Sequence, residues 1–278
     1  MKVLVTGASG YVGAKLYQDL KDSGEHEVIG TCYGSNRKPL FPELEMLNIR
    51  DVLEVYEFFQ RTKPEVVVHT AANSSASWCE KNIAEAVNLN FNGTFKVVLG
   101  VREVGAKLIY ISSFAAIEPD NVYGYTKALG EKVVRKEQDY VVVRASTIYG
   151  QSPNTQNDRP HNRLLRSIEG CGPEKYEASI RFQPTWLRHL SEVVREVIKR
   201  DIKDEVIPVA VKDLMTRFEI AGDILRGFGV EVKPDYHPER LSKDPVDLSK
   251  LAELDLPRYD FEVMLPVIVE EINRYLGR

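Results

Sequence analysis

The chain has 278 residues, of which 43% are hydrophobic and 28% charged, so it can bury a complete core and has the composition of a globular protein. Its formal net charge of -4 at pH 7 argues against nucleic acid or an anionic membrane as partner, because both favour a basic surface. The sequence opens on an expected strand, with no signal peptide and no long apolar run, so we expect a cytoplasmic protein.

Short β-branched apolar runs alternate with helical stretches through the first half of the chain. Such runs are typical of strands that are buried on both faces of a parallel sheet. The expected strands are 3–6, 27–31, 65–69, 107–111 and 140–144, and the expected helices are 11–21, 51–61, 83–105 and 123–136. These repeated β-α units predict a doubly wound α/β fold of the Rossmann type, with residues 1–150 as the nucleotide-binding domain.

The sequence changes in character after Gly150. Residues 151–160 are polar and contain prolines, which indicates a loop. Further on we expect a strand at 205–210 and helices at 161–169, 190–200, 216–228 and 260–276. Pro266 should kink the last helix or mark its true start. Residues 151–278 are therefore predicted to form a smaller, mixed substrate-binding lobe, intertwined with the first domain because some of its elements return to the core.

A glycine-rich turn follows the first expected strand and opens the first expected helix. Gly7 and Gly10 let the backbone turn tightly beside a pyrophosphate, and Gly13 lets the helix approach the sheet. The N–H groups at the start of the helix can then bind phosphate. The predicted dinucleotide contacts in this turn are Gly7, Ser9, Gly10, Tyr11, Val12 and Gly13.

The segment after the second expected strand bears on the choice between NAD(H) and NADP(H). A carboxylate at this place would bind the ribose hydroxyls of NAD, but residues 30–38 contain none. Arg37 and Lys38 can instead pair with a 2′-phosphate, which a carboxylate would repel. The segment favours NADP(H) over NAD(H), and a solvated basic turn is the alternative.

Tyr123 and Lys127 are four residues apart, so on a helix they share one face. An ammonium nearby stabilises a phenolate and lowers the tyrosine pKa from its usual value of about 10. Such a tyrosine can donate a proton to a carbonyl oxygen as a hydride arrives, or remove one in reverse. Ser112 and Ser113, at the end of the preceding strand, supply a hydroxyl to hold that oxygen. The Tyr-x-x-x-Lys spacing by itself is common and also occurs in surface pairs. Its combination with the glycine turn and the two serines is what makes the pattern specific.

Together these residues resemble the extended short-chain dehydrogenase/reductase superfamily, and within it the dTDP-4-dehydrorhamnose reductase branch. The resemblance covers essentially the first 190 residues. The segments that carry it are 6–13, 69–72, 90–94, 111–113, 123–127, 130–131, 144–150 and 183–185. It implies that Ser113 orients a substrate carbonyl, that Tyr123 is the acid/base, and that Lys127 is the partner of Tyr123.

The same resemblance implies further contacts and an assembly. The implied cofactor contacts are Asn48, Ile49, Ala71, Ala72 and Asn73, and the implied substrate contacts are Ser75, Ser113 and Thr147. In many relatives the helices around Asn90 and Tyr123 form a dimer interface, so a homodimer is expected.

The chain departs from the reductase branch around the substrate. Only residues 114–122 separate Ser113 from Tyr123, so an acidic, aromatic loop that is usual there is nearly absent. Phe114 takes the place of an aspartate, and Thr147 that of a tryptophan. The cofactor and proton chemistry thus resemble the family more closely than the sugar-binding surface does.

The expected activity is NADP(H)-dependent reduction of a keto group on a nucleotide-linked sugar. One alternative is a nucleotide-sugar epimerase, although such enzymes usually hold NAD. The other is an NADP-binding regulatory subunit of a partner enzyme, because the regulatory subunit of methionine adenosyltransferase resembles the same branch. No metal site is expected, since the histidines lack metal-ligand spacing.

Overall fold

The computed structural model describes residues 1–34, 41–239, 242 and 244–278. Arg37 and Lys38, the expected ligands of a 2′-phosphate, therefore lie outside the described residues. The described chain forms two compact units. The first contains Met1–Arg144 and Val193–Ile207, and the second contains Ala145–Glu192 and Pro208–Arg278.

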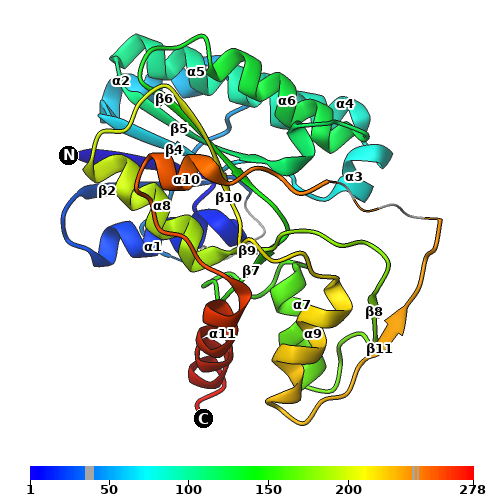
Figure 1. The fold of residues 1–278 in the computed structure, drawn as a ribbon. Coiled ribbons are helices and arrows are strands. Elements are labelled where there is room, and N and C mark those ends of the chain that lie inside the picture. The colour runs from blue at the N-terminus through cyan, green and yellow to red at the C-terminus, as the bar shows by residue number, and fades with distance from the viewer. Residues whose placement is uncertain (35–40, 240–241, 243) are drawn as a thin grey trace. The chain divides into compact units, whose positions relative to one another are not determined.

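A parallel β-sheet forms the centre of the first unit (Figure 1). Its strand order is β10-β6-β5-β4-β1-β2-β3, and β1 pairs in parallel with both β2 and β4. The strands are β1 (Lys2–Thr6), β2 (Glu27–Cys32), β3 (Glu45–Met46), β4 (Val66–His69), β5 (Lys107–Ser113), β6 (Tyr140–Ala145) and β10 (Glu205–Val209). The order reverses between β1 and β4, and ligands of such sheets bind outside the carboxyl ends of the strands at that point. The expected doubly wound α/β fold is confirmed.

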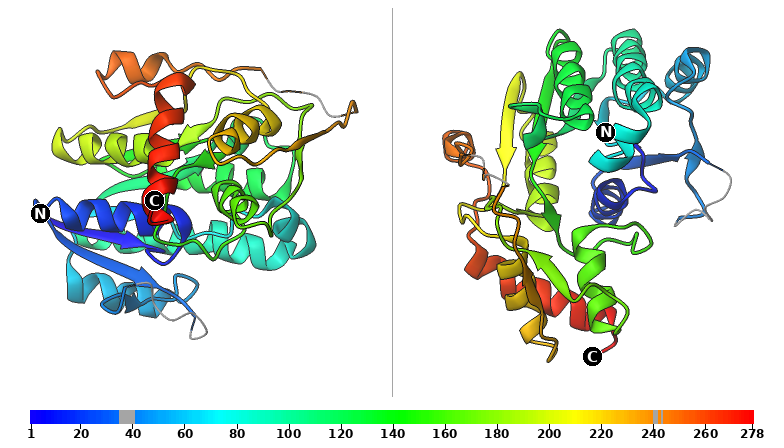
Figure 2. Two further views of the ribbon diagram at one scale, coloured as in Figure 1. Left: turned by 90° about the horizontal axis from the view of Figure 1, so that it is seen from below. Right: turned by 90° about the vertical axis from the view of Figure 1, so that its right-hand side faces the viewer.

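Helices cover both faces of this sheet. α2 (Val52–Thr62), α5 (Gly93–Val104) and α6 (Val122–Val134) lie on one face (Figure 1). α1 (Tyr11–Asp22) and the second half of α8 (Leu187–Lys199) lie on the other. The view from below in Figure 2 shows α1, in dark blue, beside β1.

The sequence of each element explains its burial. β4 consists of three valines and His69, all of them buried, as a strand with a helix layer on each face requires. α2 turns Val55, Phe58 and Phe59 inward at helical spacing. The ring of Phe59 lies so close to α5 that a Cβ at Gly100 would be 2.9 Å from it. This packing joins α2 and α5 into one layer.

The helical stretch expected over 83–105 is continuous in the structure from Ile83 to Val104, but it is not α-helical throughout. α4 (Ile83–Ala86) leads into a π-helical segment, Val87–Asn92, and α5 follows. A π-helical segment changes the direction in which its side chains point, and such segments are frequent at functional sites. Asn90 lies within it and is fully buried.

The second unit contains helices and very short strands. The helices are the first half of α8 together with α7 (Pro160–Ile168), α9 (Arg217–Arg226), α10 (Ser249–Glu253) and α11 (Phe261–Tyr275). The strands β7 (Ile148–Tyr149) and β9 (Thr185–Trp186) form one parallel pair, and β8 (Lys175–Glu177) and β11 (Lys233–Asp235) form another. Leu164, Trp186, Ile220, Met264 and Ile268 are members of the apolar core of this unit.

The last helix begins where its cap predicts. The Asp260 side chain accepts a hydrogen bond from the backbone N–H of Val263, 3.1 Å away, and α11 starts at Phe261. Pro266 lies inside the helix, so the idea that this proline marks its true start is wrong. A capped first turn and burial of Met264 and Ile268 hold the helix through the proline.

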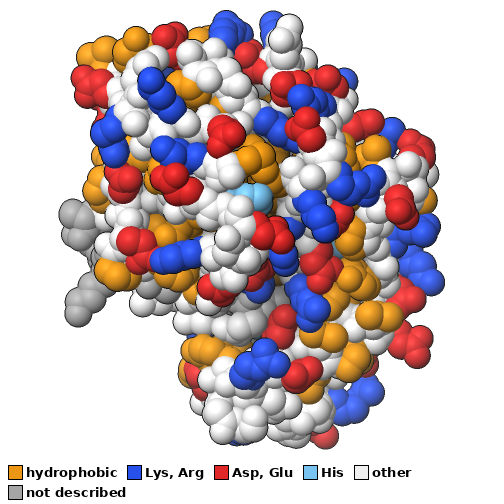
Figure 3. All heavy atoms as spheres, turned by 90° about the vertical axis from the view of Figure 1, so that its left-hand side faces the viewer, with side chains coloured by type: hydrophobic (Ala, Val, Ile, Leu, Met, Phe, Trp, Pro, Cys, Tyr) orange, Lys and Arg blue, Asp and Glu red, His pale blue; other side chains and the backbone are white. Residues whose placement is uncertain are grey.

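Acidic and basic side chains are interspersed on the face drawn in Figure 3, and neither sign forms a continuous field there. The described helices include none that is long and apolar enough to span a bilayer.

Candidate active site

The glycine turn lies between β1 and α1, at the point where the strand order reverses. Gly7 has a φ of +71°, and a Cβ there would lie 2.8 Å from the Cα of Ala71, which follows β4. A Cβ on Gly13 would lie 2.2 Å from the carbonyl oxygen of Gly7. The turn and the two strands are therefore in direct backbone contact, and no side chain fits at either glycine.

The start of α1 suits an anion. Gly10 is its N-cap and provides no side-chain cap, and the first turn of α1 has no acidic residue. The helix dipole therefore favours negative charge at this end. Tyr11 is buried, while Ser9 and Val12 are half-buried. The open turn and the helix start fit the diphosphate of a dinucleotide, and the predicted contacts lie together here.

The predicted adenine contacts follow β3. The N–H of Asn48 donates to Glu54 Oε1 at 2.7 Å, and Asn48 Oδ1 accepts from Arg50 Nε at 3.2 Å. Ile49 is buried against Gly93, whose Cβ would lie 2.8 Å from Ile49 Cδ1. The Ile49 side chain thus belongs to the core, so adenine contact through this residue would use its backbone. Both residues remain predictions as cofactor contacts.

Asn90 holds the segment that is predicted to line the cofactor. Asn90 Oδ1 accepts the N–H of Asn73 at 2.8 Å, and Asn90 Nδ2 donates to the carbonyl oxygen of Asn73 at 3.0 Å. Nδ2 also donates to Thr126 Oγ1 at 3.2 Å, and Thr126 donates to the carbonyl oxygen of Tyr123 at 2.8 Å. One buried amide therefore links the end of β4 to the first turn of α6.

His69, the last residue of β4, is a buried neutral imidazole. Thr94 Oγ1 donates its hydrogen to the carbonyl oxygen of Asn90 at 2.6 Å, so it accepts from His69 Nε2 at 3.0 Å. His69 Nδ1 must then accept from Thr6 Oγ1 at 2.6 Å. Burial, and then the nearby Lys127 charge, lower the pKa of His69 to about 3. His69 is therefore part of the packed core beside the end of the sheet.

Ser113 lies at the end of β5 and caps a 3₁₀ turn, Phe114–Ala116. Its Oγ accepts the N–H of Ala115 at 3.2 Å, which leaves the hydroxyl hydrogen available to donate. A Cβ on Gly124 would lie 2.5 Å from the carbonyl oxygen of Ala115. The turn after Ser113 therefore rests against the start of α6, next to Tyr123.

Lys127 is 3% exposed and lies on α6 one turn after Tyr123. Its Nζ donates to the carbonyl oxygen of Ile111 at 2.7 Å and lies 3.9 Å from the centre of the Tyr110 ring. Burial lowers the pKa of Lys127 to about 7, and the Glu131 carboxylate opposes that shift. Tyr125, which is two residues from both Tyr123 and Lys127 in the sequence, is 57% exposed and faces away from this site.

A buried ion pair lies one helical turn beyond Lys127. Glu131 Oε2 accepts from Arg144 Nη2 at 2.6 Å, and Glu131 Oε1 accepts from Arg144 Nε at 3.0 Å. Ser112 Oγ donates to Glu131 Oε1 at 2.5 Å. The sequence leaves the role of Arg144 open between ion pair and substrate contact, and the structure shows the ion pair.

Two predicted substrate residues have structural contacts of their own. Ser75 caps α3 (Ala76–Lys81) by accepting the N–H of Trp78 at 3.3 Å. Thr147 belongs to the second unit, where its carbonyl oxygen accepts the N–H of Thr185 at 3.0 Å. Their contacts with a substrate remain predictions.

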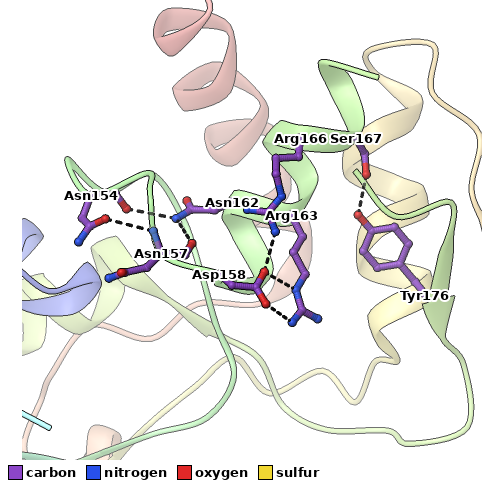
Figure 4. A network of polar contacts seen from close by, with 8 residues as sticks. All are labelled: Asn154, Asn157, Asp158, Asn162, Arg163, Arg166, Ser167 and Tyr176. Carbon is purple, nitrogen blue, oxygen red and sulfur yellow. Dashed lines mark hydrogen bonds and ion pairs between the residues drawn. The ribbon is translucent and has the colours of Figure 1, made fainter. Parts of the chain in front are cut away.

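The polar loop expected after Gly150 is ordered by its own side chains (Figure 4). Asn162 Nδ2 donates to the carbonyl oxygens of Asn154 and Asn157, at 3.2 and 2.8 Å. Asp158 binds Arg163 and Arg166 of α7, each at 2.6 Å, and these cations hold the pKa of its carboxyl far below the usual range. Within the described residues, no group of His, Cys, Asp and Glu side chains could hold a metal ion.

These features define a class of protein. The strand order, the glycine turn where that order reverses, and the tyrosine–lysine helix beside it are those of a dinucleotide-binding Rossmann protein of the short-chain dehydrogenase type. The chain belongs to the RmlD substrate binding domain family, whose model matches residues 1–256.

Three similar proteins illustrate the range of this fold. Methionine adenosyltransferase 2 subunit beta of Xenopus tropicalis is 26% identical over 266 residues, which are 88% of this chain and 76% of the relative. The dTDP-4-dehydrorhamnose reductase of Bacillus anthracis in complex with NADP has a TM-score of 0.80 and 22% identity, covering 97% and 99% of the two chains. The UDP-glucose 4-epimerase of Thermotoga maritima with UDP-glucose has a TM-score of 0.83 and 21% identity, covering 99% and 100%. The fold is therefore shared by reductases and epimerases.

Proposed function

We propose that this protein is an NADP(H)-dependent oxidoreductase that reduces a keto group on a nucleotide-linked sugar. The observation that carries the proposal is the buried Lys127 amine on the same helix as Tyr123, with the Ser113 hydroxyl beside that helix. Family membership supports it, as does the likeness to a structure named dTDP-4-dehydrorhamnose reductase.

The roles of the three residues follow from their contacts. When bound, NADPH supplies the hydride. Ser113 can donate its hydroxyl hydrogen to the substrate carbonyl oxygen, because its lone pair already accepts the N–H of Ala115. Tyr123 gives its phenolic proton to the same oxygen, and a charged Lys127 stabilises the phenolate that remains. The pKa of about 7 lets Lys127 take up or release a proton near neutral pH.

Two observations support NADP(H) as the cofactor. The Bacillus anthracis reductase structure holds NADP. Residues 30–38 of this chain contain no acidic residue that would repel a 2′-phosphate. The glycine turn and the start of α1 would hold the diphosphate in either cofactor.

We also propose a cytoplasmic homodimer. Phe95 on α5 and Tyr125 and Leu129 on α6 are large apolar side chains that are exposed on the described chain. Exposed apolar side chains on these two helices support an interface with a second copy.

Replacement of Tyr123 tests the proposal. In Tyr123→Phe the ring stays and the proton donor is lost, so NADPH oxidation with 4-keto nucleotide sugars should fall by about 100-fold or more. NADPH affinity should change little. Tyr125→Phe is the matched control and should keep full activity. Equal rates for Tyr123→Phe and the native protein would refute the catalytic role.

A second candidate function is that of a dinucleotide-binding subunit of another enzyme. The similarity to a protein named as a subunit favours it, and so does the short segment between Ser113 and Tyr123. This reading predicts that the native protein binds NADPH, reduces no nucleotide sugar and co-purifies with a stoichiometric partner. Sugar interconversion without net NADPH consumption would instead indicate an epimerase.

A further inference from the structure

Arg50 and Tyr33 lie beyond the carboxyl ends of the strands, on the side of the sheet where the nucleotide turn is found. Tyr33 directly follows β2, and Arg50 comes shortly after β3. β2 and β3 are parallel neighbours, with Cys32 opposite Met46, so both strands end on this same side of the sheet. The carbonyl oxygen of Thr31 accepts the N–H of Ala8 at 2.7 Å, which ties the end of β2 to the glycine turn.

The Arg50 guanidinium is held from two sides. Its Cζ lies 4.9 Å from the centre of the Tyr33 ring, a cation–π distance. Its Nε donates to Asn48 Oδ1 at 3.2 Å. The carbonyl oxygen of Arg50 accepts from Lys96 Nζ at 2.5 Å, which brings a second positive charge to the same place. The guanidinium is therefore positioned before any ligand arrives.

Arg50 makes no ion pair with any described carboxylate, and its two Nη atoms make no hydrogen bond within the described residues. The nearby acids are occupied by backbone N–H groups: Glu54 accepts from Asn48, and Asp51 accepts from Leu53 and Glu54.

Arg61 on α2 provides the contrast. Its guanidinium also lies over a ring, that of Phe58, at 4.8 Å, but it is paired with Glu45 at 2.6 Å. Of these two stacked arginines, only Arg50 has terminal donors that no described residue engages, and only Arg50 is close to the nucleotide turn.

We propose that Arg50, held against Tyr33, binds the 2′-phosphate of NADP(H) and thereby selects this cofactor over NAD(H). The proposal rests on the proposed function, because it concerns the cofactor of that reaction. A planar guanidinium offers parallel N–H donors to phosphate oxygens, and the ribose hydroxyl of NAD carries no charge to pair with it. Asn48 then has a role besides adenine contact, which is to fix the plane of Arg50.

Dissociation constants for NADPH and NADH, measured by fluorescence titration without substrate, test the proposal. In Arg50→Ala the affinity for NADPH should fall by about 10- to 100-fold, while the affinity for NADH changes by less than about twofold. Arg50→Lys should be intermediate, because it keeps the charge and loses the planar fork. Tyr33→Ala should weaken the binding of NADPH but not of NADH, because the ring that holds the Arg50 guanidinium is lost. Arg61→Ala should change neither affinity.

The possible results distinguish a failure of the Arg50 proposal from a failure of the proposed function. If Arg50→Ala leaves NADPH affinity unchanged, or lowers both affinities equally, Arg50 is not the selecting residue. If Arg37→Ala removes the preference for NADPH and Arg50→Ala does not, the selecting cation is Arg37 and the inference fails. A native protein that binds both cofactors equally overturns this inference only. A native protein that binds neither overturns the proposed function. The melting temperature of each variant, compared with that of the native protein, shows whether a loss of affinity is caused by unfolding.

Discussion

At Gly13 an absent side chain allows the nucleotide turn to form. In Gly13→Ala the new methyl would overlap the carbonyl oxygen of Gly7, at 2.2 Å, and crowd Thr70 Oγ1, at 2.5 Å. Because both neighbours are held by the backbone or by hydrogen bonds to it, the turn must open. We expect loss of detectable NADPH binding and a clear loss of thermal stability.

Gly222 provides the matched control for this substitution. It lies inside α9, and the nearest atom to a Cβ there, outside the local backbone of the helix, would be Val232 Cγ2 at 4.0 Å. Gly222→Ala should therefore stabilise the protein by about 0.5–1 kcal/mol through helix propensity, without affecting NADPH binding. If Gly13→Ala binds NADPH like the native protein, the turn is not the diphosphate site.

Site residues that are close together in the sequence could be predicted as a group. Site residues that only the fold brings together could not. The glycine spacing placed the nucleotide turn, and the four-residue spacing placed Tyr123 and Lys127 on one helix face. Asn90 bonds to residues 17 and 36 positions away, so no local pattern reveals its part in the site. Arg50 was missed for the same reason, since Tyr33 meets it only because β2 and β3 are neighbours.

At the scale of elements, the Glu131–Arg144 pair joins α6 to β6, and Ser112 of β5 is bonded to the same carboxylate. Arg144→Met would leave the Glu131 carboxylate buried and without its ion pair, while the hydrogen bond from the Ser112 hydroxyl stays. A buried charge that loses its partner costs about 3–5 kcal/mol, so the free energy of unfolding should fall by that amount. Adding Glu131→Gln removes the charge and should recover part of the loss. Urea unfolding of the two single variants and the double variant measures both effects.

Arg274 offers a control for this cycle. It pairs with Glu270 across one turn of α11, and both side chains are mostly exposed. Arg274→Ala should cost less than about 1 kcal/mol. An Arg144→Met variant as stable as Arg274→Ala would show that the buried pair does not hold these elements together.

Long periodic elements were predicted well, and short or irregular ones were not. The expected strands of the sheet and the helices over 11–21 and 51–61 match the structure to within one or two residues, because their apolar periods are strong. β7, β9 and β11 have two or three residues each, too few to show a period. The π-helical segment has the composition of an ordinary helix, so only its hydrogen bonding reveals it.

At the scale of the whole molecule, buried histidines predict sensitivity to acid. His69 in the first unit and His161 in the second are fully buried, and burial lowers the pKa of each from 6.5 to about 3. Between these values the unfolded chain binds protons that the folded chain does not. Stability should therefore be highest above pH 6.5 and fall as the pH drops, by about 2 kcal/mol for each histidine at pH 5.

Urea unfolding between pH 7 and pH 4 measures this dependence. His69→Gln cannot titrate in this range, so its unfolding free energy should fall less steeply with pH than that of the native protein, whatever its stability at pH 7. His161→Gln should do the same for the second unit. Parallel curves for the native protein and both variants would show that other groups cause the acid response.

The path of the chain between its two units has a practical consequence. The chain leaves the first unit after Arg144, returns to it at Val193 and leaves again after Ile207, so α8 and β10 each contribute to both units. A fragment that stops near residue 150 would lack β10, and β6 would become an open edge on which other chains could add strands. A single cut between Arg144 and Val193 therefore yields no intact nucleotide-binding half, because only a fragment that runs through Val209 contains every strand of the sheet.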